Sequence, residues 1–130
     1  MIGVTLDTGA LVAMERRKAR GTMLLMAAKE QRAELFATTP VIAEWWRGRT
    51  DRRDDIKRSV TVVPLSLAAA EAAGLVLGRI RNARERAGLA VDVMVMAFAA
   101  LHGGGLVYTS DVGDLTRLGE YFPSVRVLAV

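Results

Sequence analysis

The chain contains no cysteine and only one histidine among its 130 residues. Without thiols it can form neither a disulfide framework nor a thiolate metal site, so a bound metal would need oxygen ligands. His102 follows an apolar run that we expect to be helical, at the far end of that helix. This position fits a helix cap or a surface residue, and it disfavours a Ser–His–Asp triad or a histidine-based metal site.

Long hydrophobic runs are also missing. No stretch reaches the roughly 18 apolar residues of a membrane span, and the N-terminus "MIGVTLDTGA" lacks the charged and apolar regions of a secretory signal. A phosphate loop of the G-x-x-x-x-G-K type is absent too, which disfavours a P-loop enzyme. The lack of cysteine agrees with a reducing compartment. We therefore expect a soluble cytoplasmic protein with no membrane partner.

Aromatic residues make up only 5% of the chain, but hydrophobic residues make up 52%, and a chain of this length can form one domain, residues 1–130. The net charge is +4, and most of the basic residues are arginines, which bind phosphate well. Arginine-rich runs are also typical of solvated helix faces. Taken together, the runs indicate a nucleic-acid partner, and the run at 45–58 supplies four candidate RNA contacts: Arg47, Arg49, Arg52 and Arg53.

Short apolar segments alternate with helical patterns along the whole chain. The expected strands are 2–6, 34–40, 59–65, 106–110 and 125–130. The expected helices are 8–19, 22–33, 41–48, 67–88, 91–102 and a short one after residue 111, with a mobile loop at 48–55. Short apolar strands that alternate with helices are typical of a parallel sheet covered on both faces, so the predicted class is α/β.

Acidic residues fall at the predicted carboxyl ends of the strands, where open parallel sheets bind their ligands. Asp7 follows the first strand and Asp111 follows the fourth. Glu44 and Asp92 lie near the starts of helices that leave the same edge, and Asp114 lies one turn beyond Asp111. Such carboxylates repel one another and raise each other's pKa unless a cation holds them. Mg²⁺ or Mn²⁺, as one ion or two, prefers such oxygen ligands.

Carboxylates, a divalent metal and arginine together are suited to phosphodiester hydrolysis, because the metal activates water and stabilises phosphoryl charge. Three hydroxyls, those of Thr8, Thr109 and Ser110, flank the acids and can orient them, although hydroxyls are equally typical of strand ends and N-caps. Asp92 precedes the apolar run that begins at Val93, so we expect it to cap that helix as well as to bind metal.

The ordered set of segments "VTLDTGAL", "TTPVIAEWWRG", "AVDVMVMAFAAL" and "LVYTSDVGDL" resembles the PIN-domain ribonucleases of the VapC toxin type, across essentially the whole chain. The resemblance implies a three-layer α/β/α sandwich with a central, mostly parallel five-stranded sheet, and a homodimer. It also implies an Mg²⁺- or Mn²⁺-dependent endoribonuclease that cuts structured RNA such as tRNA or rRNA.

The resemblance further implies site residues and an inhibitor. Asp7 and Asp92 would be the principal metal ligands, Glu44 and Asp111 would complete the set, and Asp114 would support them. A VapB-type antitoxin would wrap the toxin, push a basic side chain into the acidic pocket and repress the shared operon.

Other interpretations remain open. The chain could be a non-catalytic α/β module that binds RNA or a protein and whose acids are only helix caps, which predicts no metal dependence. A DNA nuclease could use the same residues. An aspartyl-phosphate phosphatase with Asp7 as nucleophile would need a second acid two residues on and a positioned lysine, and "LDTGAL" supplies neither. Trp45 and Trp46 could stack on a base or contact the antitoxin, although core or dimer packing is commoner for tryptophan.

Overall fold

The computed structural model describes residues 3–17, 19–46 and 51–130, with all their side chains except those of residues 24 and 51–54. Its centre is a five-stranded sheet in the order β3-β2-β1-β4-β5, and every neighbouring pair of strands is parallel. The strands are β1 (Gly3–Leu6), β2 (Glu34–Thr38), β3 (Thr61–Val63), β4 (Leu106–Thr109) and β5 (Arg126–Ala129). The predicted α/β class and parallel sheet are confirmed.

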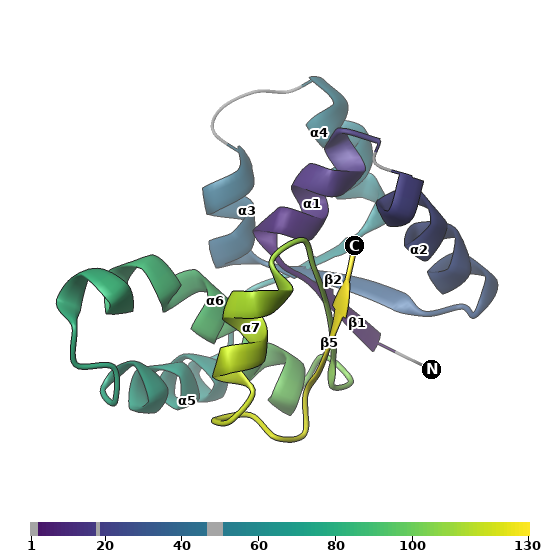
Figure 1. The fold of residues 1–130 in the computed structure, drawn as a ribbon. Coiled ribbons are helices and arrows are strands. Elements are labelled where there is room, and N and C mark those ends of the chain that lie inside the picture. Colours follow the sequence, from purple (N-terminus) through teal and green to yellow (C-terminus); the bar gives the residue numbers. More distant parts are fainter. Residues whose placement is uncertain (1–2, 18, 47–50) are drawn as a thin grey trace.

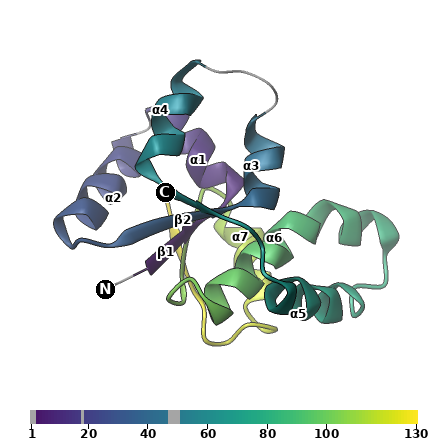
Figure 2. The same cartoon turned by 180° about the vertical axis from the view of Figure 1, so that it is seen from behind.

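Helices cover both faces of this sheet. They are α1 (Thr8–Glu15), α2 (Ala19–Glu30), α3 (Thr39–Trp46), α4 (Asp51–Ser59), α5 (Leu67–Leu77), α6 (Ala83–Leu101) and α7 (Val112–Leu118). Two opposite views place α1, α2 and α4 on one side of the sheet, and α5, α6 and α7 on the other (Figures 1 and 2). None of the described helices is both long enough and apolar enough to cross a membrane.

The two tryptophans have different surroundings. Trp45 is fully buried, and its indole N–H donates to Glu15 Oε2 at 3.2 Å, which confirms core packing for this residue. Trp46 is half-buried, and the ammonium group of Lys57 lies 4.3 Å from the centre of its ring. These ring contacts anchor α3, the helix that carries Glu44.

The segment between residues 67 and 102 differs from the prediction. The expected helix 67–88 is wrong, because α5 ends at Leu77 and a turn follows. Ile80 is buried in this turn, and Asn82 then caps α6 by accepting the N–H of Glu85 at 2.9 Å. Asp92 therefore lies in the middle of a 19-residue helix, and its predicted role as an N-cap is wrong.

Two further expectations about loops and helix ends are corrected. Part of the predicted loop 48–55 is helical, since α4 begins at Asp51. Burial of Ile56 anchors this helix, and Lys57 and Arg58 in its last turn complement the helix dipole. The first helix ends at Glu15, four residues earlier than expected, and α2 begins at Ala19.

Loss of the Asn82 cap should destabilise the protein. Asn82→Ala removes the acceptor for the N–H of Glu85, and we expect it to lower the free energy of unfolding by about 1 kcal/mol. Denaturant melts would measure this loss, and Asn82→Asp, which keeps an acceptor, is the matched control. Equal stability of Asn82→Ala and the wild-type chain would contradict the cap.

Candidate active site

Asp7 lies at the junction between β1 and α1 and is only 4% exposed. Its Oδ1 accepts the N–H of Ala10 at 2.7 Å, as an N-cap does, and its Oδ2 accepts a hydrogen bond from the hydroxyl of Thr109. Its own N–H donates to the carbonyl of Tyr108 at 3.2 Å. Two hydrogen bonds to the carboxylate and one from the backbone therefore hold Asp7 at the carboxyl edge of the sheet.

Thr109 connects Asp7 to the start of α7. Its hydroxyl oxygen accepts a hydrogen bond from the N–H of Asp111 at 2.8 Å, and its O–H donates a hydrogen bond to Asp7. Asp111 caps α7, with Oδ1 3.4 Å from the backbone nitrogen of Asp114, and Asp114 forms an ion pair with Arg117. The adjacency of β1 and β4 thus brings the acids of the two strand ends together, as the sequence predicted.

Glu44 reaches the same edge from α3. The hydroxyl of Thr8 donates to its Oε1 at 2.5 Å, so the first residue of α1 orients a side chain of α3. Ser110 is exposed, and its hydroxyl packs against Gly9, where an added Cβ atom would lie only 2.2 Å from the Ser110 oxygen. Gly9 thereby permits the close approach of α1 to the residues that follow β4.

The pKa values of two carboxyl groups are strongly raised. For Asp7, burial raises the pKa to about 6, against the hydrogen bonds from Thr109 and Ala10, which lower it; the charges of Asp111 and Glu44 raise it further. For Asp92, which is half-buried on α6, burial is again the largest cause and raises the pKa to about 7.

The charges that act on Asp92 show which acids share this region. They belong, from largest to smallest effect, to Asp7, Glu44, Asp114 and Asp111. All five acids singled out from the sequence are therefore close enough to interact electrostatically. The middle of α6 carries Asp92 to this edge, although the sequence predicted a helix start there.

The set of donors suits a hard divalent cation, because it consists of carboxylate oxygens alone and carries an excess of negative charge. Within the described residues, no three acidic or histidine side chains are arranged, as they stand, so that they could hold a metal ion. Hydrogen bonds from Thr8, Thr109 and Ala10 and an ion pair with Arg117 engage the carboxylates of Glu44, Asp7 and Asp114 in this arrangement.

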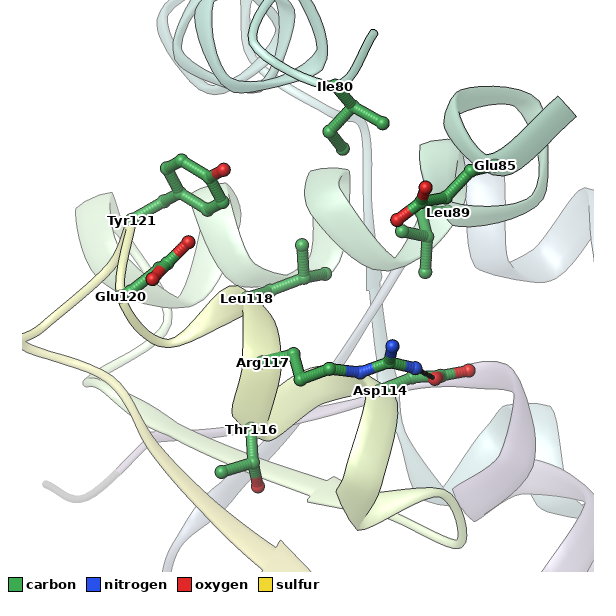
Figure 3. A pocket seen from close by; sticks show the side chains of 9 residues that line it. All are labelled: Ile80, Glu85, Leu89, Asp114, Thr116, Arg117, Leu118, Glu120 and Tyr121. Carbon is green, nitrogen blue, oxygen red and sulfur yellow. Dashed lines mark hydrogen bonds and ion pairs between the residues drawn. The ribbon is translucent and has the colours of Figure 1, made fainter. Parts of the chain in front are cut away.

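A groove of about 530 Å³ lies beside these acids (Figure 3). Its apolar residues are Ile80, Leu89, Leu118 and Tyr121, and its charged residues are Glu85, Asp114, Arg117 and Glu120. Arg117 extends toward Asp114, so the groove borders the acidic edge (Figure 3). Nothing in the sequence pattern indicated this groove, because it forms only where the α5–α6 turn meets α7.

Some predicted residues are not part of this geometry. Arg47 and Arg49 lie outside the described residues, and Arg52 and Arg53 belong to α4 but their side chains are not among those described. His102 is exposed at the end of α6, where its ring nitrogen Nε2 lies 3.0 Å from the Ser66 hydroxyl, in agreement with a cap or surface residue.

Comparison with known proteins adds a fold relationship. No protein-family profile matches the chain, and neither does any curated protein sequence. Among solved structures, a chain of VapBC2 from Rickettsia felis, bound to a DNA fragment from its promoter, matches with a TM-score of 0.63 and 15% identity. The match covers 100% of this chain and 99% of the other. The two chains share a fold.

Proposed function

We propose that this chain is the toxin of a VapBC-type toxin–antitoxin pair, a cytoplasmic endoribonuclease that needs Mg²⁺ or Mn²⁺ and cuts structured RNA such as tRNA or rRNA. The observation that carries the proposal is the gathering of five carboxylates at the carboxyl edge of the sheet, two of them with pKa values raised to about 6 and about 7. The full-length fold likeness to a VapBC2 chain supports it.

In this proposal the clustered acids hold the cation and neighbouring groups keep their carboxylates in place. Asp7 and Asp92 would be its principal ligands, with Glu44 and Asp111 beside them. A bound divalent cation supplies an activated water and stabilises phosphoryl charge. Thr109 and the N–H of Ala10 fix the Asp7 carboxylate, and Thr8 orients Glu44.

Cleavage of total tRNA and rRNA by the purified chain tests the function. Reactions would contain Mn²⁺, Mg²⁺ or EDTA, with single- and double-stranded DNA as parallel substrates. We expect discrete RNA cuts that require metal. Intact RNA in every reaction, from protein shown to be folded, would favour the non-catalytic binding module, and cleavage of DNA alone would favour a DNA nuclease.

The groove provides a place for the antitoxin in this proposal. Three carboxylates, from Glu85, Asp114 and Glu120, line it against one arginine, Arg117, and apolar side chains form much of the rest of its lining. This chemistry suits a polypeptide segment with basic and apolar side chains better than it suits a phosphate backbone. Because the groove borders Asp114, such a segment could place a basic side chain at the acidic edge.

Reversal of charge in the groove should weaken antitoxin binding. We expect Glu85→Arg with Glu120→Arg to lower the affinity for the product of the adjacent gene in a shared operon roughly 10-fold or more. Co-expression, purification and calorimetry would measure it. Glu30→Arg, at an exposed position of α2 across the sheet, is the matched control, and equal losses in both variants would argue against the groove.

A homodimer is also part of the proposal. Leu67 and Leu75 on α5 are 74% and 77% exposed, more than any other large apolar side chain among the described residues, and a second copy that packs on α5 would bury both. Leu75→Glu is expected to shift the protein toward monomer in analytical ultracentrifugation. A sedimentation coefficient unchanged from the wild-type value would exclude α5 from the interface.

A further inference from the structure

A buried hydroxyl at the acidic edge has no partner. Thr38, the last residue of β2, is fully buried, and its Oγ1 has no hydrogen-bond partner among the described residues. Buried hydroxyls are nearly always paired, because an unsatisfied polar group in the interior is destabilising. Because Thr38 ends the strand next to the candidate active site, a bound ligand would bring polar groups near its hydroxyl.

The strand register places Thr38 beside Asp7. β1 and β2 pair Thr5 with Phe36, so two residues further along both strands Thr38 lies next to Asp7. Thr38 shares a sheet face with Phe36, whose ring contacts Phe98 of α6 at a centroid distance of 5.7 Å. Thr38 thus faces the helix that carries Asp92.

Asp7 is flanked by threonines on both sides, but only one of them is engaged. On β4, the register continues from Leu6 and Tyr108 to Asp7 and Thr109. The Thr109 hydroxyl donates to Asp7 and accepts from the N–H of Asp111. On β2, the Thr38 hydroxyl keeps its full capacity as donor and acceptor toward the described residues.

A second unpartnered hydroxyl, that of Thr5, provides an internal comparison. Thr5 is also fully buried on this face, but it precedes Asp7 by two residues. A Cβ atom added at Gly103 would lie 2.2 Å from its Oγ1, so this hydroxyl packs against the residues between α6 and β4, away from the carboxyl edge. The two threonines share burial and strand environment and differ in their distance from the acids.

We propose that Thr38 is a positioning residue of the acidic site, whose hydroxyl hydrogen-bonds a carboxylate or water ligand of the divalent cation held by Asp7 and Asp92. The inference rests on the proposed metal-dependent function. Hydrogen bonds to the ligands of a metal orient those ligands, and their loss typically lowers metal affinity about 10- to 100-fold. Thr38 would do on the β2 side of Asp7 what Thr109 does on the β4 side.

Thr38→Val and the control Thr5→Val test this, because each replaces a hydroxyl by a methyl group of similar size. In EDTA, we expect both variants to raise Tm by roughly 2–5 °C, since each removes an unsatisfied buried hydroxyl. Titration of Mn²⁺ by calorimetry should then show at least about 10-fold weaker binding for Thr38→Val only. Thr38→Ser, which keeps the hydroxyl, should bind Mn²⁺ like the wild-type chain.

The outcomes separate the inference from the function on which it rests. If the wild-type chain binds Mn²⁺ and Thr38→Val binds it equally well, the inference is overturned while the metal site stands. If Thr38→Val lowers Tm in EDTA, the hydroxyl already has a partner in the metal-free protein, which also overturns the inference. If the wild-type chain binds no Mn²⁺, the proposed function and the inference fail together.

Discussion

Asp7→Asn is expected to reduce metal-dependent RNA cleavage to below about 1% of the wild-type rate, a barrier increase of about 3 kcal/mol or more. The side-chain amide keeps an oxygen that can accept the N–H of Ala10 and cap α1, so the fold should persist. The Asp7→Asn variant lacks the negative charge that a divalent cation requires at the buried centre of the site. Single-turnover cleavage assays with Mn²⁺ would measure the rate, and circular dichroism would verify folding.

The matched control is Glu30→Gln, which makes the same change from carboxylate to amide at an exposed position on α2, across the sheet from α6 and its Asp92. It should cleave RNA at the wild-type rate. If folded Asp7→Asn protein also cleaves at the wild-type rate, the reaction does not occur at the carboxyl edge of the sheet, and the proposed site is wrong.

Stability of the metal-free protein is expected to fall as the pH rises from about 4 to about 8. In the folded state the pKa of Asp7 is about 6 and that of Asp92 is about 7. In the unfolded chain both carboxyl groups have the ordinary aspartate pKa of 3.8. At a pH between the unfolded-state pKa and the folded-state pKa of a group, the folded state binds more protons than the unfolded state. The stabilisation present at low pH is therefore lost as the pH rises to and through each folded-state pKa. For Asp7 alone the loss amounts to about 3 kcal/mol, and half-buried Asp92 adds to it in the same direction.

Urea melts at a series of pH values in EDTA would measure this trend. Asp92→Asn should flatten it and should be more stable than the wild-type chain at pH 8, because it removes a half-buried charge that four neighbouring acids repel. Saturating Mn²⁺ should reverse it by stabilising the ionised acids. A wild-type stability that rises with pH in EDTA would show that folding does not raise the pKa values of Asp7 and Asp92.

The position of Asp92 illustrates both a success and a failure of prediction from sequence. Its place just before an apolar run predicted both a helix cap and a member of the acidic cluster. In the structure Asp92 lies among the other acids, as predicted. It does not cap a helix, because Asn82 caps α6 ten residues earlier. A helix start is a local feature, but it depends on how the burial of Ile80 shapes the preceding turn, and the apolar pattern on either side does not encode that turn.

Thr38 shows the opposite case. Nothing in "ELFATTP" marks this threonine, since polar residues commonly end strands. Its place beside Asp7 follows from the pairing of β1 with β2, and its lack of a partner among the described residues follows from the packing around it. The groove bordering Asp114 is likewise a product of packing between the α5–α6 turn and α7.

The sequence by itself determined the α/β class, the parallel sheet and the acids at its carboxyl edge. Alternation of short apolar strands with helices leaves few other ways to bury apolar surface, and parallel strands all end at the same edge. Only the tertiary structure decided where α6 begins, which hydroxyls hold the acids and which described hydroxyl beside them is left without a partner. These features depend on contacts between residues far apart in the chain, such as Thr109 with Asp7 and Thr8 with Glu44.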